Sequence, residues 1–321
     1  MKKIIWICTG DIAYYPGKIG DVFVSICVAD YIQKIGYQTY FITNEFMFEK
    51  LKNTYSNMSF SFMDKLILSK NDLLMCEKAD FIFIMRPFNN LEGDFWGKQL
   101  SDSGIRKNKI FRVDSLNSFS PNGPHITQQI LNYILEILNE KKIIKELYSL
   151  LKIKKINEKE QFDYIILPFA GNKNKWMPEK LLMGLVLKLK GKIGIFGAPY
   201  GEELERISYY KSRLKEFTNV KISAKSIEDV CYASSKCKEI FCMDGGLTWS
   251  VVSYLNFLGL NKELQRKYFP LIKVITGRDL NKNLPTSQVW KPLSIYQEKI
   301  IEINEKQELK IEDIKIEMLL N

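Results

Sequence analysis

Residues 4–36, which read IIWICTGDIAYYPGKIGDVFVSICVADYIQKIG, contain the unit from which we expect the fold to be built. The run Ile4–Cys8 is short and continuously apolar, which is typical of a strand buried on both faces of a parallel sheet. From Asp21 onward apolar residues recur at helical spacing, and Gly36 stands where a helix C-terminal cap belongs. The stretch therefore predicts a strand, a loop and a helix.

The same alternation of strand and helix continues along the chain. Further strands are predicted at Tyr40–Thr43, Phe81–Met85, Ile110–Val113, Tyr164–Leu167, Ile193–Phe196 and Ile240–Met243. Helices are predicted at Pro124–Asn139, Pro178–Lys190 and Lys310–Leu320, with a short one that begins after the capping pair Ser226 and Asp229. Repeated alternation of this kind predicts a doubly wound α/β fold.

The length of the chain predicts two domains, because 321 residues exceed the usual size of one hydrophobic core. The segment Lys152–Gln161 is dense in Lys and Glu and is the predicted linker. We place an N-terminal domain at residues 1–157 and a C-terminal domain at 158–293. Residues 294–321 form a tail that we expect to be helical and to pack back on the domains.

The charge is positive and evenly spread. The formal net charge is +10, with 21 basic and 16 acidic residues in 1–157 and 26 and 21 in 158–321. An even spread argues against a dedicated nucleic-acid face, and it suits phosphate-bearing ligands or weak attraction to an anionic membrane. A solvated Lys-rich surface explains the same charge.

The cysteines and the N-terminus indicate a reducing compartment. No two of the six cysteines form a C-x-x-C pair, and most lie in apolar segments, so we expect buried thiols rather than zinc ligands or disulfides. The apolar run after Lys3 ends too early for a signal peptide or a membrane span, because Asp11 interrupts it. We therefore expect a cytoplasmic protein.

Three loops follow predicted strands, at the edge where ligands bind in open α/β sheets. In the first, Gly17, Lys18, Gly20 and Asp21 stand before a helix, and Asp21 is either a general base for an acceptor hydroxyl or an ordinary helix cap. Gly10-Asp11 is a competing pair in the same loop.

The second and third loops carry features that suit a diphosphate. Gly171, Asn172 and Lys175 precede Pro178, so backbone N–H groups and an ammonium could meet phosphate there, although a solvated basic loop has the same pattern. The third loop offers a carboxylate and two glycines at a helix start, or alternatively a simple turn. It comprises Asp244, Gly245, Gly246, Leu247, Thr248 and Trp249.

The order of these loops resembles glycosyltransferase family 9, the ADP-heptose heptosyltransferases. The family pattern Gly-x-x-Gly-Asp matches Gly17, Gly20 and Asp21, and its Lys-x-Trp-Pro is similar to Lys175-Trp176-Met177-Pro178 with one residue displaced. Its Asp-Ser/Thr-Gly-x-x-His looks like Asp244-Gly245-Gly246-Leu247-Thr248-Trp249. The likeness spans most of residues 1–293.

Two departures from the family pattern concern the donor. Trp249 replaces the family histidine, and Phe169–Asn172 stand where the family often has hydroxyl residues. Trp249 either stacks on a sugar or base or belongs to the core. An apparent insertion at Asn256–Phe269 separates the following helix from its strand.

The resemblance implies a GT-B fold, in which two Rossmann-like domains face a cleft. It also implies an inverting, metal-independent and cofactor-independent transfer, with Asp21 as the base and Lys175 at the donor phosphate. The implied donor is ADP-heptose or a related nucleotide sugar, and the implied acceptor is a surface glycan or glycolipid such as lipopolysaccharide or capsule. We also expect weak contact with the cytoplasmic face of the inner membrane. We expect no nucleic-acid partner.

Two other classes remain alternatives. A sugar-nucleotide or glycan-binding relic is consistent with Trp249, and a nicotinamide-dependent oxidoreductase would share the doubly wound domains but lacks a Gly-x-Gly-x-x-Gly after the first strand. The single histidine, His125, argues against a Ser-His-Asp hydrolase or a multi-histidine metal site, and we interpret it as a helix cap.

Overall fold

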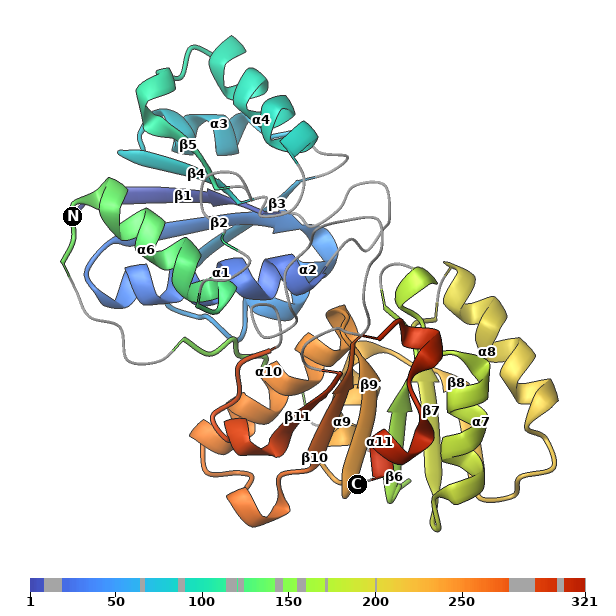
Figure 1. Ribbon diagram of the computed structural model, residues 1–321. Helices are drawn as coiled ribbons and strands as arrows, with labels where there is room; N and C mark the ends of the chain where they lie inside the picture. The colour runs from blue at the N-terminus through green and yellow to red at the C-terminus, as the bar shows by residue number, and fades with distance from the viewer. Residues whose placement is uncertain are drawn as a thin grey trace. The chain divides into compact units, whose positions relative to one another are not determined.

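The computed structural model describes two compact units, Met1–Lys152 and Ile153–Asn321 (Figure 1). The residues described are 1–8, 19–63, 67–85, 90–113, 120, 124–141, 147–154, 160–170, 173–199, 201–276, 292–304 and 309–320. The domain boundary expected at residues 157 and 158 lies outside them.

The first unit contains a five-stranded sheet in the order β3-β2-β1-β4-β5, and every pairing is parallel. Its strands are β1 (Lys3–Ile7), β2 (Gln38–Asn44), β3 (Ser59–Met63), β4 (Phe81–Met85) and β5 (Ile110–Val113). Its helices are α1 (Ile19–Lys34), α2 (Glu45–Leu51), α3 (Lys70–Glu77), α4 (Asn90–Asp102) and α6 (Ile126–Leu138), with a 3-10 turn η1 at Lys107–Lys109.

Helices cover both faces of this sheet, because its central strand is apolar on both sides. Ile5 and Ile7 of β1 belong to a core that includes Trp96 of α4. Trp6 points the other way and stacks on Phe83 of β4, with ring centroids 5.2 Å apart. Both faces of β1 are thus buried, as its continuous apolar run predicts.

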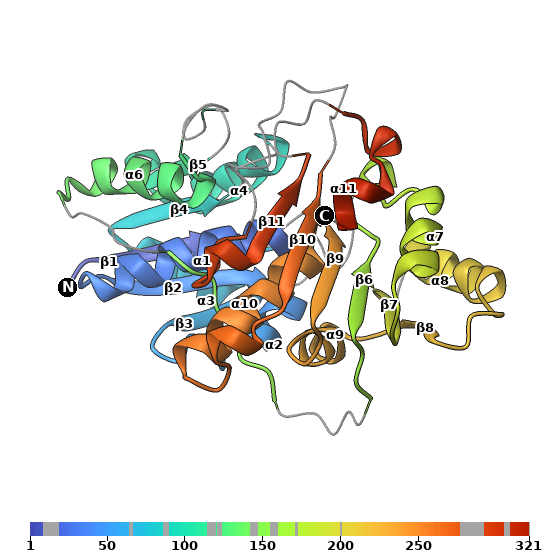
Figure 2. The ribbon, with the colours of Figure 1, turned by 60° about the horizontal axis from the view of Figure 1, so that its bottom comes forward.

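The second unit contains a six-stranded parallel sheet, and Figure 2 shows its order β11-β10-β9-β6-β7-β8. Its strands are β6 (Tyr164–Leu167), β7 (Ile193–Gly197), β8 (Val220–Ala224), β9 (Glu239–Met243), β10 (Leu271–Ile275) and β11 (Ile300–Ile303). Its helices are α7 (Glu179–Lys188), α8 (Gly201–Arg213), α9 (Ile227–Ser234), α10 (Gly246–Leu260) and α11 (Ile316–Leu320), and its 3-10 turns are η2 (Lys173–Lys175), η3 (Arg266–Tyr268), η5 (Gln297–Lys299) and η6 (Ile311–Asp313).

The chain order of the second sheet reverses next to β6, whose neighbours are β7 and β9. Side chains of α7, α8 and α11 share one core with one face of the sheet. The helices α9 and α10 pack against each other, and the right-handed crossovers of parallel strands place them on the opposite face. This is the strand order typical of dinucleotide-binding sheets, and it leaves a crevice position between β6 and β9.

Several local predictions are confirmed. Gly36 has φ +107, His125 caps α6 by accepting the Thr127 N–H, and Ser226 caps α9 by accepting the Asp229 N–H. All six cysteines are buried thiols that form no disulfide. In the part of the chain that is described, no helix has both the length and the apolarity that crossing a bilayer requires.

Other elements differ from the sequence prediction. The tail, expected to be helical, contributes strand β11, which pairs with β10, and its helix begins only at Ile316. Pro178 is the N-cap of α7 rather than its first residue. The helix α10 continues to Leu260, through the start of the supposed insertion, because apolar residues continue there without a Gly or Pro break before Gly259.

Candidate functional site

The loops that follow β6 and β9 meet at the point where the chain order of the second sheet reverses. A Cβ atom added at Gly245 would lie 3.0 Å from the Cα of Ala170 and 3.3 Å from the carbonyl oxygen of Phe169. A residue with a side chain would force the two backbones apart by a few tenths of an ångström, because the atoms it meets are backbone atoms. Gly245 therefore brings the β9 loop against the β6 loop.

Lys175 and Asp244 lie next to each other at this junction. The Lys175 Nζ is 3.9 Å from the Asp244 Oδ2, and the two side chains are 43% and 22% exposed. This distance is longer than a hydrogen bond, so the ammonium keeps its donors available for another anion. Burial raises the pKa of the Asp244 carboxyl, and Lys175 only partly offsets that effect.

The N-terminus of α10 begins at the same place. Its N-cap is Gly245, which has no side chain to accept from the first N–H groups of the helix. Gly246 and Leu247 are half-buried there. Helix starts carry partial positive charge, so this position favours an anion beside the Lys175 ammonium.

Thr248 and Trp249 fix the start of α10 by packing into the core of the second unit. The Thr248 hydroxyl donates to the Met243 carbonyl oxygen at 2.6 Å. Thr248 is only 2% exposed and Trp249 only 5% exposed. Trp249 therefore belongs to the core, one of the two interpretations of its sequence position.

The loop after β6 is held by its aromatic residues. The Trp176 indole N–H donates to the Ala170 carbonyl at 2.8 Å, and its ring meets that of Phe169 edge to face at 4.9 Å. The Met177 N–H donates to the Pro168 carbonyl at 2.8 Å. These contacts fix the turn that carries Lys175. Gly171 and Asn172 lie outside the described residues.

In the first unit, Asp21 is half-buried in the first turn of α1. Its backbone carbonyl accepts from the Ser25 hydroxyl at 2.8 Å and from the Cys8 thiol at 3.8 Å. Gly20 precedes it in the same helix, whereas Gly17, Lys18 and the competing pair Gly10-Asp11 lie outside the described residues. Asp21 thus stands beside the carboxyl end of β1, whose neighbours are β2 and β4.

The structure thereby brings Lys175 together with the loop from Asp244 to Trp249 in the second unit. Asp21 and Gly20 lie in the first unit. Among the described residues, no three His, Cys, Asp or Glu side chains gather as a metal site requires.

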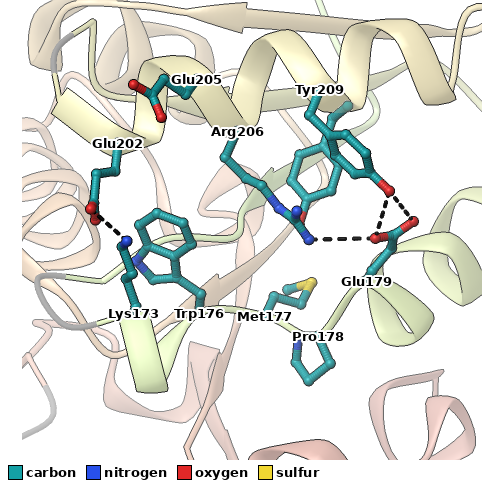
Figure 3. Close-up of a pocket in the computed structure, with 10 residues that line it drawn as sticks. Lys173, Trp176, Met177, Pro178, Glu179, Glu202, Glu205, Arg206 and Tyr209 are labelled. Carbon is teal, nitrogen blue, oxygen red and sulfur yellow. Dashed lines mark hydrogen bonds and ion pairs between the residues drawn. The ribbon is translucent and has the colours of Figure 1, made fainter.

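A pocket beside this site was not expected from the sequence. It has a volume of about 530 Å³ and lies between α8 and the turn that leads into α7 (Figure 3). We call it the α7–α8 pocket, and it is lined by Lys173, Trp176, Met177, Pro178, Glu179, Glu202, Glu205, Arg206, Tyr209 and Tyr210. Its signal in the sequence is the spacing of Glu202, Glu205, Arg206 and Tyr209, which places them on one helical face.

Solved structures share this architecture at low sequence identity. The glycosyl transferase family 9 protein from Veillonella parvula superposes with a TM-score of 0.62 and 12% identity, covering 99% of this chain and 95% of its own. The ADP-heptose lps heptosyltransferase II of E. coli gives 0.65 and 13%, covering 100% and 96%. The E. coli heptosyltransferase WaaC with ADP gives 0.56 and 13%, covering 97% of both chains.

No protein-family model matches the sequence, and no curated protein matches it significantly. The likeness therefore rests on structure and extends over nearly the whole chain in each of these three comparisons. The two parallel sheets with their interleaved helices have the α/β architecture of the GT-B class. The chain has the fold that glycosyltransferase family 9 and the ADP-heptose heptosyltransferases share.

Proposed function

We propose that the protein is a glycosyltransferase, which moves a sugar from a nucleotide diphosphate to a hydroxyl of a glycan acceptor. The observation that carries the proposal is the position of Lys175, whose ammonium lies beside Asp244 at the uncapped start of α10. An ammonium and a helix N-terminus together suit a diphosphate. The fold supports the same class, because the solved structures that superpose on this chain include a family 9 glycosyl transferase and a heptosyltransferase.

The proposed donor is ADP-heptose or a related nucleotide sugar. Two structures of E. coli WaaC hold ADP and ADP-2-deoxy-2-fluoro heptose. In this chain Lys175 and the N–H groups of Gly246 and Leu247 would bind the diphosphate and stabilise it as it leaves. We include Gly171 and Asn172 in the donor loop, while Thr248 and Trp249 support the start of α10 from the core.

The proposed base is Asp21. It takes the proton of the acceptor hydroxyl, whose oxygen attacks the anomeric carbon while the bond to the diphosphate breaks on the opposite side, which inverts the configuration. The contacts of Ser25 and Cys8 to the Asp21 carbonyl hold the first turn of α1 in place for this role. Gly17, Lys18 and Gly20 would border the acceptor.

The proposed acceptor is a cell-surface glycan or glycolipid, such as lipopolysaccharide or capsule, and the proposed location is the cytoplasm. The net charge of +10 supports weak contact with the anionic cytoplasmic face of the inner membrane.

Nucleotide release from a panel of sugar nucleotides, with glycan acceptors present, tests the proposal. We expect Asp21→Asn to lower kcat by about 10²–10⁴-fold while ADP binding is unchanged. Lys175→Met should instead weaken ADP binding about ten-fold or more, because it removes the charge beside the diphosphate. Asp30→Asn, in the same helix as Asp21 and paired with Lys34 in its last turn, is the matched control and should keep full turnover. Full turnover in Asp21→Asn would remove Asp21 from its role.

A second candidate is a sugar-nucleotide-binding protein without transfer activity. The observation that favours it is the buried Trp249 where the family pattern has His, since an indole in the core cannot assist a leaving phosphate as an imidazole can. ADP binding without release from any sugar nucleotide in the panel would support this candidate over transfer.

A further inference from the structure

We propose that the α7–α8 pocket binds a neutral sugar unit of a glycan, at a site distinct from the junction of Lys175 and Asp244. Figure 3 shows Trp176 between two ion pairs, with Met177 and Pro178 on the lower side and the helix α8 above. Aromatic surface flanked by planar polar side chains suits a pyranose, which has apolar C–H faces and a rim of hydroxyls.

Four of the five charged side chains of the pocket are paired across its walls. Lys173 Nζ lies 2.5 Å from Glu202 Oε1, and Arg206 Nη2 lies 3.4 Å from Glu179 Oε2. The Tyr209 hydroxyl is 3.0 Å and 3.1 Å from the two Glu179 oxygens. The walls therefore present donors and acceptors side by side, and hydroxyl groups need both.

The same pairs disfavour charged ligands. The Arg206 guanidinium lies 4.5 Å from the Tyr209 ring centroid and 4.9 Å from that of Tyr210, so this aromatic surface already holds a cation. An anion would have to displace Glu179 from Arg206 or Glu202 from Lys173 and would also meet Glu205. A neutral polyol can bind without breaking either pair.

The pocket is linked to the donor loop through a single turn. Trp176 follows Lys175 directly in the chain, and the backbone N–H of Trp176 donates to the Lys173 carbonyl oxygen at 2.9 Å. A sugar bound against Trp176 would lie next to the turn that orients the Lys175 ammonium. The inference concerns binding alone and goes beyond the proposed transfer, so it can hold or fail independently of it.

Saturation-transfer NMR on the full chain tests the proposal. The probes are methyl α-D-glucoside, methyl α-D-galactoside and methyl α-D-mannoside, with choline as a cationic probe and glucose 6-phosphate as an anionic one. We expect at least one glycoside to bind with millimolar affinity and to be preferred over both charged probes. Tyr209→Ala and Glu179→Gln should each weaken this binding about five-fold or more, because each removes one contact with the sugar.

The controls distinguish a loss of binding at this pocket from an effect on the donor site and from unfolding of the variant. Tyr209 is 40% exposed and Tyr268, which lies outside the pocket, is 62% exposed, so Tyr268→Ala is the matched control and should bind the glycoside normally. ADP affinity should be unchanged in the pocket variants. The proposal is overturned if no glycoside binds at up to about 100 mM, if choline or glucose 6-phosphate binds better, or if Tyr209→Ala leaves glycoside binding unchanged.

Discussion

Asp244 is placed in an environment that opposes its ionisation. Burial raises the pKa of its carboxyl above the usual value of 3.8, and the Lys175 ammonium at 3.9 Å compensates only in part. The folded protein therefore favours the protonated form more than the unfolded chain does. Such a carboxylate reduces stability where it is charged, a cost that proteins accept at functional sites.

The sign of this effect predicts a pH dependence for Asp244→Asn. The variant should have a larger free energy of unfolding than the wild type at pH 7, because Asn carries no charge to bury. The gain should shrink as the pH falls through the raised pKa toward 3.8, since the wild-type carboxyl is then neutral as well. Urea unfolding at a series of pH values measures the difference.

Asp163 provides a control of opposite sign. Hydrogen bonds from the Lys238 side chain and from the Lys192 N–H lower the pKa of its carboxyl. Its ionised form stabilises the fold above pH 3.8, and this stability is lost as the pH falls through the lowered pKa. Asp163→Asn should therefore be less stable than the wild type at pH 7. A gain in both variants would contradict the electrostatic explanation.

Substitution of Gly245 should have a steric effect at the same junction. Gly245→Ala should lower the free energy of unfolding by about 1–3 kcal/mol, because the new methyl group would lie 3.0 Å from the Ala170 Cα, a backbone atom that cannot turn aside. Lys175 and Asp244 should move apart, so ADP binding should weaken. Gly97→Ala is the control, since a Cβ there meets nothing nearer than 4.0 Å and Ala favours the helix α4 by up to about 1 kcal/mol. Equal stability losses in both variants would count against the close approach.

At the scale of elements, the position of the last helix depends on one buried lysine. Lys273 of β10 is 5% exposed, its Nζ lies 2.9 Å from Glu239 Oε1, and it also donates to the Leu319 carbonyl of α11. A buried ammonium is retained only when its donors are satisfied. Lys273 thus connects β9, β10 and α11.

Removing that lysine leaves a carboxylate without its partner. We expect Lys273→Met to lower the free energy of unfolding by about 3 kcal/mol or more. The double variant Lys273→Met with Glu239→Gln should recover much of this loss, because it removes both charges. Urea unfolding of the two single variants and the double variant measures the coupling, and additive losses would show that the pair does not interact.

The sequence predicts most of the inner strands and the edge strand β5, and leaves out the edge strands β3, β8 and β11, for a physical reason. β1, β4, β6, β7 and β9 are buried on both faces, so each is a short apolar run that stands out from its surroundings. The edge strands β3, β8 and β11 include exposed residues and read SFSFM, VKISA and IIEI. Their strand state depends on pairing with a neighbour that the local sequence does not show.

The candidate site was predicted in part for a similar reason. Strand ends and glycines are local signals, and they place Asp244, Gly245 and Lys175 correctly between a strand and the following helix. The contact between Gly245 and Ala170 joins segments that are 75 residues apart, so the local sequence of neither segment predicts it. The α7–α8 pocket likewise requires two helices from different crossovers to meet.

At the scale of the whole molecule, the two units divide the proposed reaction between them. Each has its own parallel sheet and buried core, and every donor-loop residue belongs to the second unit. We expect the isolated segment 153–321 to bind ADP with the affinity of the full chain, and to release no nucleotide from a sugar donor because Asp21 is absent. Calorimetric titration of both proteins with ADP checks this, and a large loss of affinity in the segment would assign part of the donor site to the first unit.

The pairing of β6 with β9 has a consequence for local opening of the molecule. Ile166 pairs with Phe241 although 75 residues separate them, so the chain closes a long loop to form this one junction. A nucleotide that bridges the β6 and β9 loops would hold that junction together. Amide hydrogen exchange at Ile165, Ile166 and Phe241 should slow more in the presence of ADP than exchange on the outer strand β8, so the second sheet should itself report whether its ligand is bound.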